Sequence, residues 1–332
     1  MKPQADAAVK KFRRMSIFVS IASYCDPVLG FTLVRAKQQA RHPERLRFGV
    51  IDQSPDPLEM PTAQQLLPAR LAYQRIDPVF SRGPCWARAL AMALYEGEDW
   101  FLQVDSHMDF EPGWDEQLVQ QAQALQAGRL GAVVSAYPNA FVFADGRPQA
   151  RPTTDKVLAH VVKPGHVFEA DHPVLGFEAH PVESDLPVPG FHLGAGCLFA
   201  PGRFVQAFPY DPWFYFHGEE QALAARLYTH GWDIFHMPGL PIQHLYNTPD
   251  AGVPKRPLHW DAAQDAGRPQ SWWELEQRSR RRLAQLVAGD DLGVYSLGRV
   301  RTMAQYAAWC GIDYAGKTLS QQAYEPLGPR SP

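Results

Sequence analysis

The chain has 332 residues, of which 45% are hydrophobic and 20% are charged, and its formal net charge is −3 at pH 7. This length suits one large domain, or one domain with an appendage. The charge, without a basic stripe, argues against a nucleic-acid-binding protein, and no run reaches the roughly 18 apolar residues of a membrane-spanning helix. The four cysteines are widely spaced, so we expect free thiols in a cytoplasmic protein, although spacing alone leaves a disulfide open.

The first part of the chain alternates strand and helix patterns. Residues 1–14 are basic and predict a disordered tail, after which 16–23 predict a strand, 29–40 a helix and 46–51 a second strand. This order is typical of the opening half of a nucleotide-binding α/β sheet. Asp52 and Gln53 follow the second strand and suit hydrogen bonds to a base or ribose. An ordinary pair of loop residues is the alternative.

A helix with a single arginine comes next. The Pro-rich stretch 54–69 predicts an irregular connection, 71–76 a short strand and 85–95 a helix. Arg88 stands on this helix among Ala, Leu and Met residues. An unpaired arginine is costly to bury. We therefore expect Arg88 to pair with a phosphate or with Asp105, or else to extend its charged end to water.

Residues 100–109, reading WFLQVDSHMD, contain the strongest candidate for a metal site. The apolar run 100–104 predicts a buried strand, which ends in Asp105-Ser106-His107. Residues two apart on a strand point to the same side, so Asp105 and His107 can aim at one point. A borderline cation such as Mn²⁺ accepts this oxygen and nitrogen pair, and open α/β sheets bind ligands beyond such strand ends. The alternative is a plain turn with a surface histidine.

The next stretch mixes regular and irregular patterns. Residues 114–126 predict an amphipathic helix and 130–136 a strand. Residues 138–190 show no lasting period apart from probable strands at 157–162 and 166–169, and such an excursion is typical of a functional loop or lid. In FHLGAGCLFAP, residues 191–201, the glycines Gly194 and Gly196 allow close approach to a ligand. A bulged strand is the alternative.

Acidic residues precede the last helix of the sheet region. Glu219 and Glu220 stand at the start of a helix that we expect to run from Glu220 to His230. Acids in a first turn also suit the helix dipole, so a structural role is equally compatible with the pattern. A strand at 232–236 and the segment 242–246, which carries His244, follow.

From about residue 255 the composition changes. Helical patterns at 273–287 and 300–310 predict a helical appendage over 255–332, packed on a sheet domain over 15–254. The appendage contains four closely spaced arginines between residues 278 and 282, a pattern more typical of a solvated face than of a site.

The order of motifs resembles a known enzyme family over nearly the whole chain. The stretches SIFVSIASYCDP, RGPCWARALA, WFLQVDSHMDFEPGWD, FHLGAGCLFA, YDPWFYFHGEEQALAARLYTHGWDIF and LGRVRT resemble the glycosyltransferase family of the cytoplasmic hydroxyproline N-acetylglucosaminyltransferase, which has many bacterial members. The same order is more distantly similar to the mucin-type polypeptide N-acetylgalactosaminyltransferases. Their lectin domain has no counterpart in this sequence.

The resemblance implies an α/β GT-A fold, with a Rossmann-like mixed sheet flanked by helices. It implies a retaining, metal-dependent transfer from a UDP-sugar, UDP-GlcNAc in the first place, to a hydroxyl of a protein or polysaccharide. It also implies Mn²⁺ or Mg²⁺ at Asp105, His107 and His244, with Glu219, Glu220 and Arg88 in catalysis. The residues expected to contact the donor are Ser20, Ala22, Ser23, Asp52, Arg88, Asp105, Ser106, Gly194, Ala195 and Gly196.

One position departs from the family pattern. The segment after the third metal ligand usually continues to an arginine, whereas Asn247 follows Tyr246 here. The contribution of that arginine is then absent, or another residue such as Lys255 or Arg256 supplies it.

Two other classes of protein remain open from the residues alone. A metal-dependent phosphoesterase also uses Asp and His clusters, but it normally needs two metals about 4 Å apart and more ligands than this sequence offers. A nucleotide-sugar or glycan binding protein without turnover is the second alternative. The full set of Asp105, His107, Glu219 and His244 argues against it.

Overall fold

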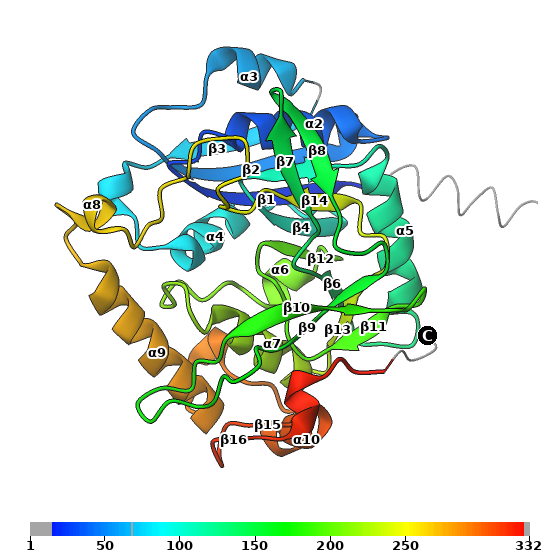
Figure 1. Ribbon diagram of the computed structural model, residues 1–332, viewed down its shortest axis with the longest axis vertical. Helices are drawn as coiled ribbons and strands as arrows, with labels where there is room; N and C mark the ends of the chain where they lie inside the picture. Colours follow the sequence, from blue (N-terminus) through cyan, green and yellow to red (C-terminus); the bar gives the residue numbers. More distant parts are fainter. Residues whose placement is uncertain (1–14, 68, 329–332) are drawn as a thin grey trace, which may run out of the picture.

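The computed structural model describes residues 15–67 and 69–328 of the chain, and the predicted tail at 1–14 lies outside them. An eight-stranded mixed sheet forms the centre of the molecule, with helices on both faces (Figure 1). Its strands, in spatial order, are β11 (Val188–Gly190), β13 (Asp233–His236), β6 (Ala132–Ser135), β12 (Cys197–Pro201), β4 (Trp100–Asp105), β1 (Ile17–Tyr24), β2 (Leu46–Gln53) and β3 (Arg70–Arg75).

The first four strands of the chain all run in the same direction. β1 to β3 and β4 run parallel, so their carboxyl ends meet at one edge, while β12 runs antiparallel between β4 and β6. Parallel strands are buried on both faces, and β1 shows it. Its residues Ile17, Val19 and Ile21 pack into one apolar cluster with α2 and α5, whereas Phe18 packs into the other with α7 and α9.

The helices fill the connections and both faces of the sheet. They are α2 (Leu29–Gln39), α3 (Met60–Gln65), α4 (Pro84–Met92), α5 (Trp114–Gln126), α6 (Phe204–Ala207), α7 (Glu219–Thr229), α8 (Ala262–Asp265), α9 (Trp272–Ala288) and α10 (Met303–Cys310). Single 3₁₀ turns occur at Pro43–Arg45, Pro78–Phe80, Gly293–Tyr295 and Gln321–Tyr324. Of the helices that the structure describes, none combines the length and apolar surface needed to cross a membrane.

Most of the predicted elements are present, and the departures have local causes. The Pro-rich stretch after β2 contains α3, which the prediction of an irregular connection missed. The last helix begins at residue 303 rather than 300 because Thr302 caps it through a capping box with Gln305. All four cysteines are free thiols, as expected.

The region 138–190 is the largest departure. It contains two antiparallel pairs instead of a loop, β7 (Ala140–Ala144) with β8 (Arg147–Arg151) and β9 (Val157–Val162) with β10 (Phe177–Val182). The strand expected at 166–169 is absent, and those residues lie in the connection between β9 and β10. β7 and β8 extend a second sheet through β14 (Ile242–His244) to β5 (Met108–Phe110). β9 coincides with the strand predicted at 157–162. β7, β8 and β10 are short and partly exposed, so they leave no helical period and little apolar alternation, and the sequence pattern did not reveal them.

The segment from 255 onward packs against the sheet domain. Leu283 and Leu286 of α9 share one buried apolar cluster with Leu223 and Leu227 of α7. A small hairpin of β15 (Ile312–Asp313) and β16 (Thr318–Leu319) follows α10. The division into a catalytic domain and an appendage therefore stays a prediction about folding units, since the two parts share a core.

A glycine in β2 gives a test of this packing. The β-carbon of an alanine at Gly49 would lie 2.2 Å from the Phe18 ring, which is fully buried. We expect Gly49→Ala to lower the free energy of unfolding by about 1–3 kcal/mol, the usual cost of overpacking a core. Urea unfolding followed by circular dichroism measures it. Gly328→Ala, where an added β-carbon meets nothing, is the control, and equal stability of the two variants would contradict the packing.

Candidate active site

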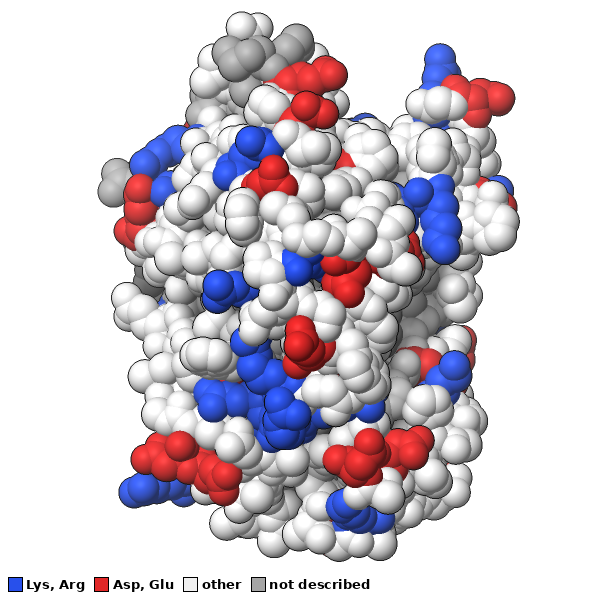
Figure 2. Space-filling view, turned by 90° about the vertical axis from the view of Figure 1, so that its left-hand side faces the viewer, with Lys and Arg blue, Asp and Glu red and all other residues white. Residues whose placement is uncertain are grey.

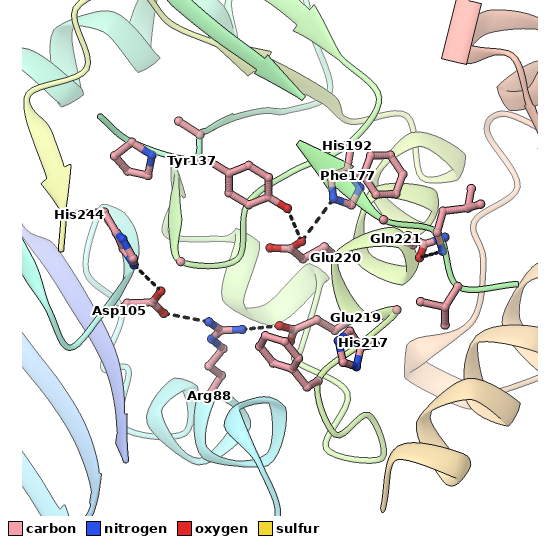
Figure 3. Close-up of a pocket in the computed structure, with 18 of the residues that line it drawn as sticks. Arg88, Asp105, Tyr137, Phe177, His192, His217, Glu219, Glu220, Gln221 and His244 are labelled. Atoms are coloured by element: carbon pink, nitrogen blue, oxygen red, sulfur yellow. Dashed lines mark hydrogen bonds and ion pairs between the residues drawn. The ribbon is translucent and has the colours of Figure 1, made fainter. Parts of the chain in front are cut away.

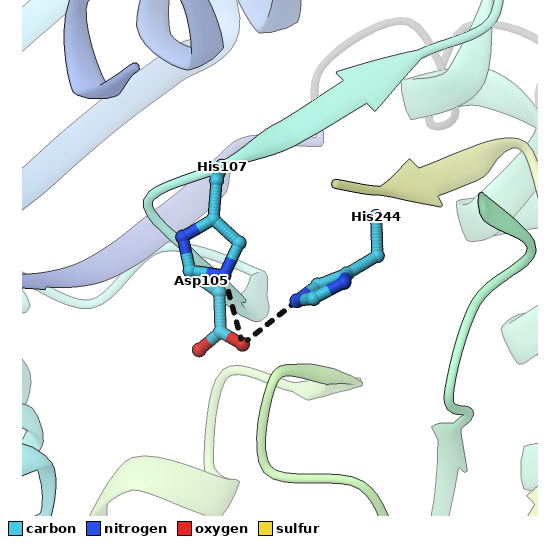
Figure 4. A group of neighbouring side chains, drawn as sticks. All are labelled: Asp105, His107 and His244. Carbon is cyan, nitrogen blue, oxygen red and sulfur yellow. Dashed lines mark ion pairs between the residues drawn. The ribbon is translucent and has the colours of Figure 1, made fainter. Parts of the chain in front are cut away.

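Three side chains converge beyond the carboxyl end of β4. Asp105 ends this strand, His107 follows two residues later, and His244 ends β14. β14 pairs antiparallel with β5, with His244 opposite Met108, which brings His244 beside His107 (Figure 4). One ligand atom from each of the three residues lies within 4.8 Å of the others. The predicted convergence of Asp105, His107 and His244 is therefore confirmed.

A carboxylate that the sequence analysis missed orients His107. Asp26 is buried, and its Oδ2 lies 2.6 Å from His107 Nδ1 and accepts a 2.6 Å hydrogen bond from Ser106 Oγ. The other ring nitrogen, Nε2, is left facing Asp105 Oδ2 at 3.9 Å. Metal-binding histidines commonly hold a carboxylate with their second nitrogen in this way. The signal in the sequence was an acidic residue directly after β1, at the same sheet edge as Asp105.

The charge states of the cluster suit a divalent cation. Burial lowers the pKa of His244 to about 4, so its imidazole is neutral at pH 7 and has a lone pair to offer. Burial works to raise the pKa of Asp105, but the hydrogen bond with His244 and the charge of Arg88 outweigh it and hold that pKa well below its usual range. One oxygen and two nitrogen ligands fit Mn²⁺ better than Mg²⁺, which prefers oxygen alone.

Arg88 links this cluster to the start of α7. Its guanidinium is buried and donates to Asp105 Oδ1 at 3.1 Å and to Glu219 Oε1 at 2.6 Å (Figure 3). Of the alternatives considered for Arg88, the structure shows the pairing with Asp105. Glu219 also accepts hydrogen bonds from the Tyr210 hydroxyl and the Cys85 thiol. Burial raises the pKa of Glu219, and Arg88 opposes that rise.

Glu220 lies in a different environment from Glu219. Its carboxylate accepts hydrogen bonds from the backbone N–H of Ala195 and from the hydroxyl of Tyr137, both at 2.7 Å, and lies 3.3 Å from His192 Nε2. Burial favours a higher pKa, but these donors, His192 first, lower the pKa of Glu220. The side chain is 25% exposed, against 5% for Glu219. Glu220 is therefore the ionised acid that a ligand can reach.

A pocket of about 400 Å³ lies between the metal cluster and these acids, within the size range of small-molecule sites. Residues 174–177, from the region expected to be a functional loop, form one wall, and Phe216 and His217 form another. The lining also includes Arg88, Asp105, Tyr137, His192, Gly196, Glu219, Glu220, Gln221, His244 and Tyr246.

The glycine segment 194–196 fits between the metal cluster and Glu220. A β-carbon at Gly196 would lie 2.4 Å from Asp105 Oδ2, so only glycine allows the chain to pass so close to this carboxylate. A β-carbon at Gly194 would lie 2.5 Å from the Ala136 carbonyl oxygen. Only Cys197–Pro201 of the predicted segment forms the strand β12. The small residues therefore place Ala195 N–H against Glu220 and leave Asp105 accessible.

The expected nucleotide contacts are only partly placed for that role. Ser20 is fully buried in the middle of β1, four residues before the strand ends at Tyr24, and its contact with the donor stays a prediction. Ser23 is also fully buried, whereas Ala22 is partly exposed. Asp52 lines an open groove of about 930 Å³ and accepts hydrogen bonds from Tyr73 and Ser54. This groove lies at the same sheet edge as the metal cluster and shares Asp26 with it.

The departure at Asn247 has a counterpart nearby. The Asn247 side chain accepts a hydrogen bond from Arg256 N at 3.1 Å and donates one to Arg256 O at 3.2 Å, which fixes the backbone of that residue. The Arg256 side chain is buried, with Nε 3.9 Å from Asp26 Oδ2. Its Nη1 has no hydrogen-bond partner among the described residues. Lys255, the other residue considered, lines the open groove instead.

Comparisons with known proteins agree with this geometry. The family model "Glycosyltransferase (GlcNAc)" matches residues 16–69 and 56–316. No curated protein is similar enough in sequence to match the chain. Among solved structures, GalNAc-T7 with UDP, GalNAc and Mn²⁺ is 13% identical, with a TM-score of 0.55, and the match covers 75% of this chain and 46% of that chain. The S. aureus TarS fragment 1–349 with UDP-GlcNAc is 13% identical, with a TM-score of 0.42, and the match covers 92% of this chain and 82% of that chain.

The chain thus spans less than half the length of the GalNAc-T7 chain. That structural similarity shows the fold, which is GT-A, as the motif order predicted. The family model covers well over half of the chain, so the protein belongs to the GlcNAc glycosyltransferase family.

Proposed function

We propose that this enzyme transfers a sugar, N-acetylglucosamine in the first place, from a UDP-sugar to a hydroxyl group with the help of a divalent metal. The observation that carries the proposal is the cluster of Asp105, His107 and His244 at the rim of a sugar-sized pocket that also contains Glu219 and Glu220. The family description names GlcNAc, and the GalNAc-T7 structure contains UDP and Mn²⁺. Both support this choice of donor and metal.

The chain provides the charges that a departing diphosphate needs. A divalent metal held by Asp105, His107 and His244 would act as a Lewis acid on the leaving group. Arg256 brings a buried positive charge close to this cluster with one nitrogen unpaired, as a phosphate ligand requires. We assign to Arg256 the role that the arginine after the third metal ligand has in related enzymes. Arg88 holds Asp105 in place and is a positioning residue.

The transfer is proposed to retain the anomeric configuration. Glu220 is held by three donors and ionised, and Glu219 is occupied by Arg88, Tyr210 and Cys85. These contacts engage both carboxylates, and we assign a covalent intermediate to neither. The acceptor hydroxyl then attacks from the side of the departing phosphate, which takes its proton, while Glu220 orients the sugar or the acceptor.

The remaining parts of the proposal concern the acceptor and the cell. A protein hydroxyl, including a hydroxyproline, and a polysaccharide hydroxyl are both compatible with the pocket. We also propose a cytoplasmic location, from the four free cysteines. A two-metal phosphoesterase gains no support, because the described residues contain a single group of three or more candidate metal ligands.

Removing the metal or its oxygen ligand tests the proposal directly. We expect EDTA to abolish UDP-GlcNAc hydrolysis and Mn²⁺ to restore it. Asp105→Asn keeps the shape of the side chain but should lower turnover by about 10²-fold or more, the scale for loss of one transition-state stabiliser. Calorimetric titration with Mn²⁺ should show weakened binding. Asp99→Asn, just before the other end of β4, is the control, and full Mn²⁺-dependent turnover by Asp105→Asn would refute the site.

The two glutamates should respond differently to the loss of charge. Glu220→Gln should keep the melting temperature and lower turnover by about 10²-fold, because its carboxylate faces the pocket. Glu219→Gln leaves Arg88 with Asp105 alone, and a broken buried ion pair costs about 3–5 kcal/mol, so this variant should mainly lose stability. Thermal unfolding and initial rates measure both. A stable but inactive Glu219→Gln variant would reverse the two roles.

The groove beside Asp52 should select the base of the nucleotide. We expect UDP with Mn²⁺ to raise the melting temperature more than GDP with Mn²⁺, since stabilisation follows affinity for the folded state. Asp52→Asn should reduce the difference between the two nucleotides. Equal stabilisation of the wild-type protein by UDP and GDP would count against a uracil-specific groove.

A further inference from the structure

Arginine and tryptophan side chains gather on the face formed by α9 and the start of α4. We call this the Arg–Trp patch and define it as Arg82, Trp86, Trp213, Arg278 and Arg281. Figure 2 shows a block of basic side chains in the lower half of this face. Two of the arginines belong to the run at 278–282 that the sequence pattern assigned to a solvated face. The proposed chemistry at Asp105 uses none of the five residues.

The arginines of the patch differ from their neighbours on α9 in how their charges are paired. Arg280 and Arg282, from the same run, pair with Glu276 at 3.3 Å and Asp211 at 2.8 Å. Among the described residues, none of Arg82, Arg278 and Arg281 forms an ion pair with a carboxylate. Burial, and then the neighbouring charge of Arg82, lower the pKa of Arg278, Asp211 opposes this shift, and Arg281 adds to it. The three like charges repel one another, and a bound anion would relieve that repulsion.

The aromatic rings give the patch a second kind of surface. The Arg278 guanidinium lies 5.0 Å from the ring centre of Trp213, and that of Arg82 lies 5.9 Å from Trp86. Trp213 is 52% exposed. A flat indole ring packs against the C–H face of a sugar ring, and a guanidinium binds phosphate or carboxylate through two parallel hydrogen bonds. An exposed tryptophan ring beside guanidinium groups that lack a carboxylate partner among the described residues therefore matches a charged glycan better than a simple anion.

The patch is physically continuous with the pocket. Arg278 Nε donates to the carbonyl oxygen of Trp213, and Ser279 bonds to Tyr215 N and to the carbonyl oxygen of His217. The segment 213–217 therefore lies along α9. Its end at residues 216 and 217 lines the pocket that contains the acids, while Trp213 belongs to the patch. A polymer bound on the patch could follow this segment to the reaction centre.

We propose that the Arg–Trp patch binds an acceptor glycan that carries phosphate or carboxylate groups along its length. The role as acceptor site rests on the proposed function, whereas binding itself does not. A glycan is favoured over an acidic peptide or an anionic membrane because the exposed tryptophan leads into a sugar-sized pocket. Phosphate and carboxylate share the chemistry that the arginines recognise.

Affinity electrophoresis of the full-length protein tests binding without catalysis. Gels contain phosphomannan, alginate or neutral mannan, and we expect retardation by one or both charged polymers, weakening with salt. The triple variant Arg82→Gln/Arg278→Gln/Arg281→Gln should lose about tenfold or more in affinity. Arg41→Gln/Arg147→Gln/Arg299→Gln removes the same charge from exposed positions outside the patch and should bind normally. Trp213→Ala should weaken glycan binding without changing retardation by poly-L-glutamate.

The competing partners are outcomes of the same experiment. If poly-L-glutamate retarded the wild-type protein as strongly as the charged glycans do, and Trp213→Ala weakened neither interaction, the proposal would be overturned in favour of an acidic peptide. Tighter binding to phosphatidylglycerol vesicles than to either glycan would overturn it in favour of a membrane, and equal affinity of the two triple variants would exclude the patch altogether. UDP-GlcNAc hydrolysis should be unchanged in the patch triple variant. If the wild-type protein did not hydrolyse UDP-GlcNAc, by contrast, that result would contradict the proposed function and not the binding site.

Discussion

The site depends on one buried cation. Arg88 stands on α4 with almost no exposure, and it is kept charged by carboxylates from two other elements, Asp105 at the end of β4 and Glu219 at the start of α7. A buried guanidinium without such partners would cost several kcal/mol. The requirement therefore fixes three elements relative to one another. β4 ends in the candidate metal ligand Asp105, and α7 begins with the acids of the pocket. The distance between the metal cluster and these acids is therefore set by the length of the Arg88 side chain.

The hydrogen bonds around this cation give the two neighbouring acids, Glu219 and Glu220, different roles. Residues 219 and 220 are about 100° apart around α7, which directs one carboxylate inward to Arg88 and the other toward the pocket. The glycine segment then supplies a backbone N–H to the second acid while it passes the metal ligand at close range. The ion pair with Arg88 and the close approach of Gly196 thus both involve the same side chain, Asp105. This explains why the motifs Arg88, Asp105, 194–196 and 219–220 occur together.

The sequence predicted the parts of the site that local patterns determine. Strand ends place Asp105 and His107 on one side, and the helix 114–126 was located to the residue because its apolar period is long and regular. In the region 138–190 the strand at 157–162 was predicted and is β9, whereas β7, β8 and β10 were missed because they are short and partly exposed, and β7 also pairs with the distant β14. Asp26 and Arg256 were understated for a similar reason. Their importance comes from contacts across the fold, with His107 and with the metal cluster, that no spacing in the sequence reveals.

Ser20 lies in the interior of β1, enclosed on both sides by paired strands. A small hydroxyl is tolerated in such a position because its volume is close to that of alanine. The strand was predicted to end at residue 23, one residue before its observed end at Tyr24. Position along the strand, and not polarity alone, therefore decides which side chains reach the sheet edge. In this sheet the true ends are marked by Asp52 and Asp105, whose carboxylates open toward the groove and the pocket.

The pairing of β14 with β5 has a consequence for how the enzyme is made. Every strand of the large sheet has been synthesised once β13 is complete, but His244 belongs to β14, which leaves the ribosome later. A nascent chain with a finished sheet would thus present only Asp105 and His107 to a metal. When β14 is added, it pairs with β5, and a bound ion would link its His244 to Asp105 and His107. The set of three ligands is therefore complete only after the sheet that carries Asp105 has been synthesised.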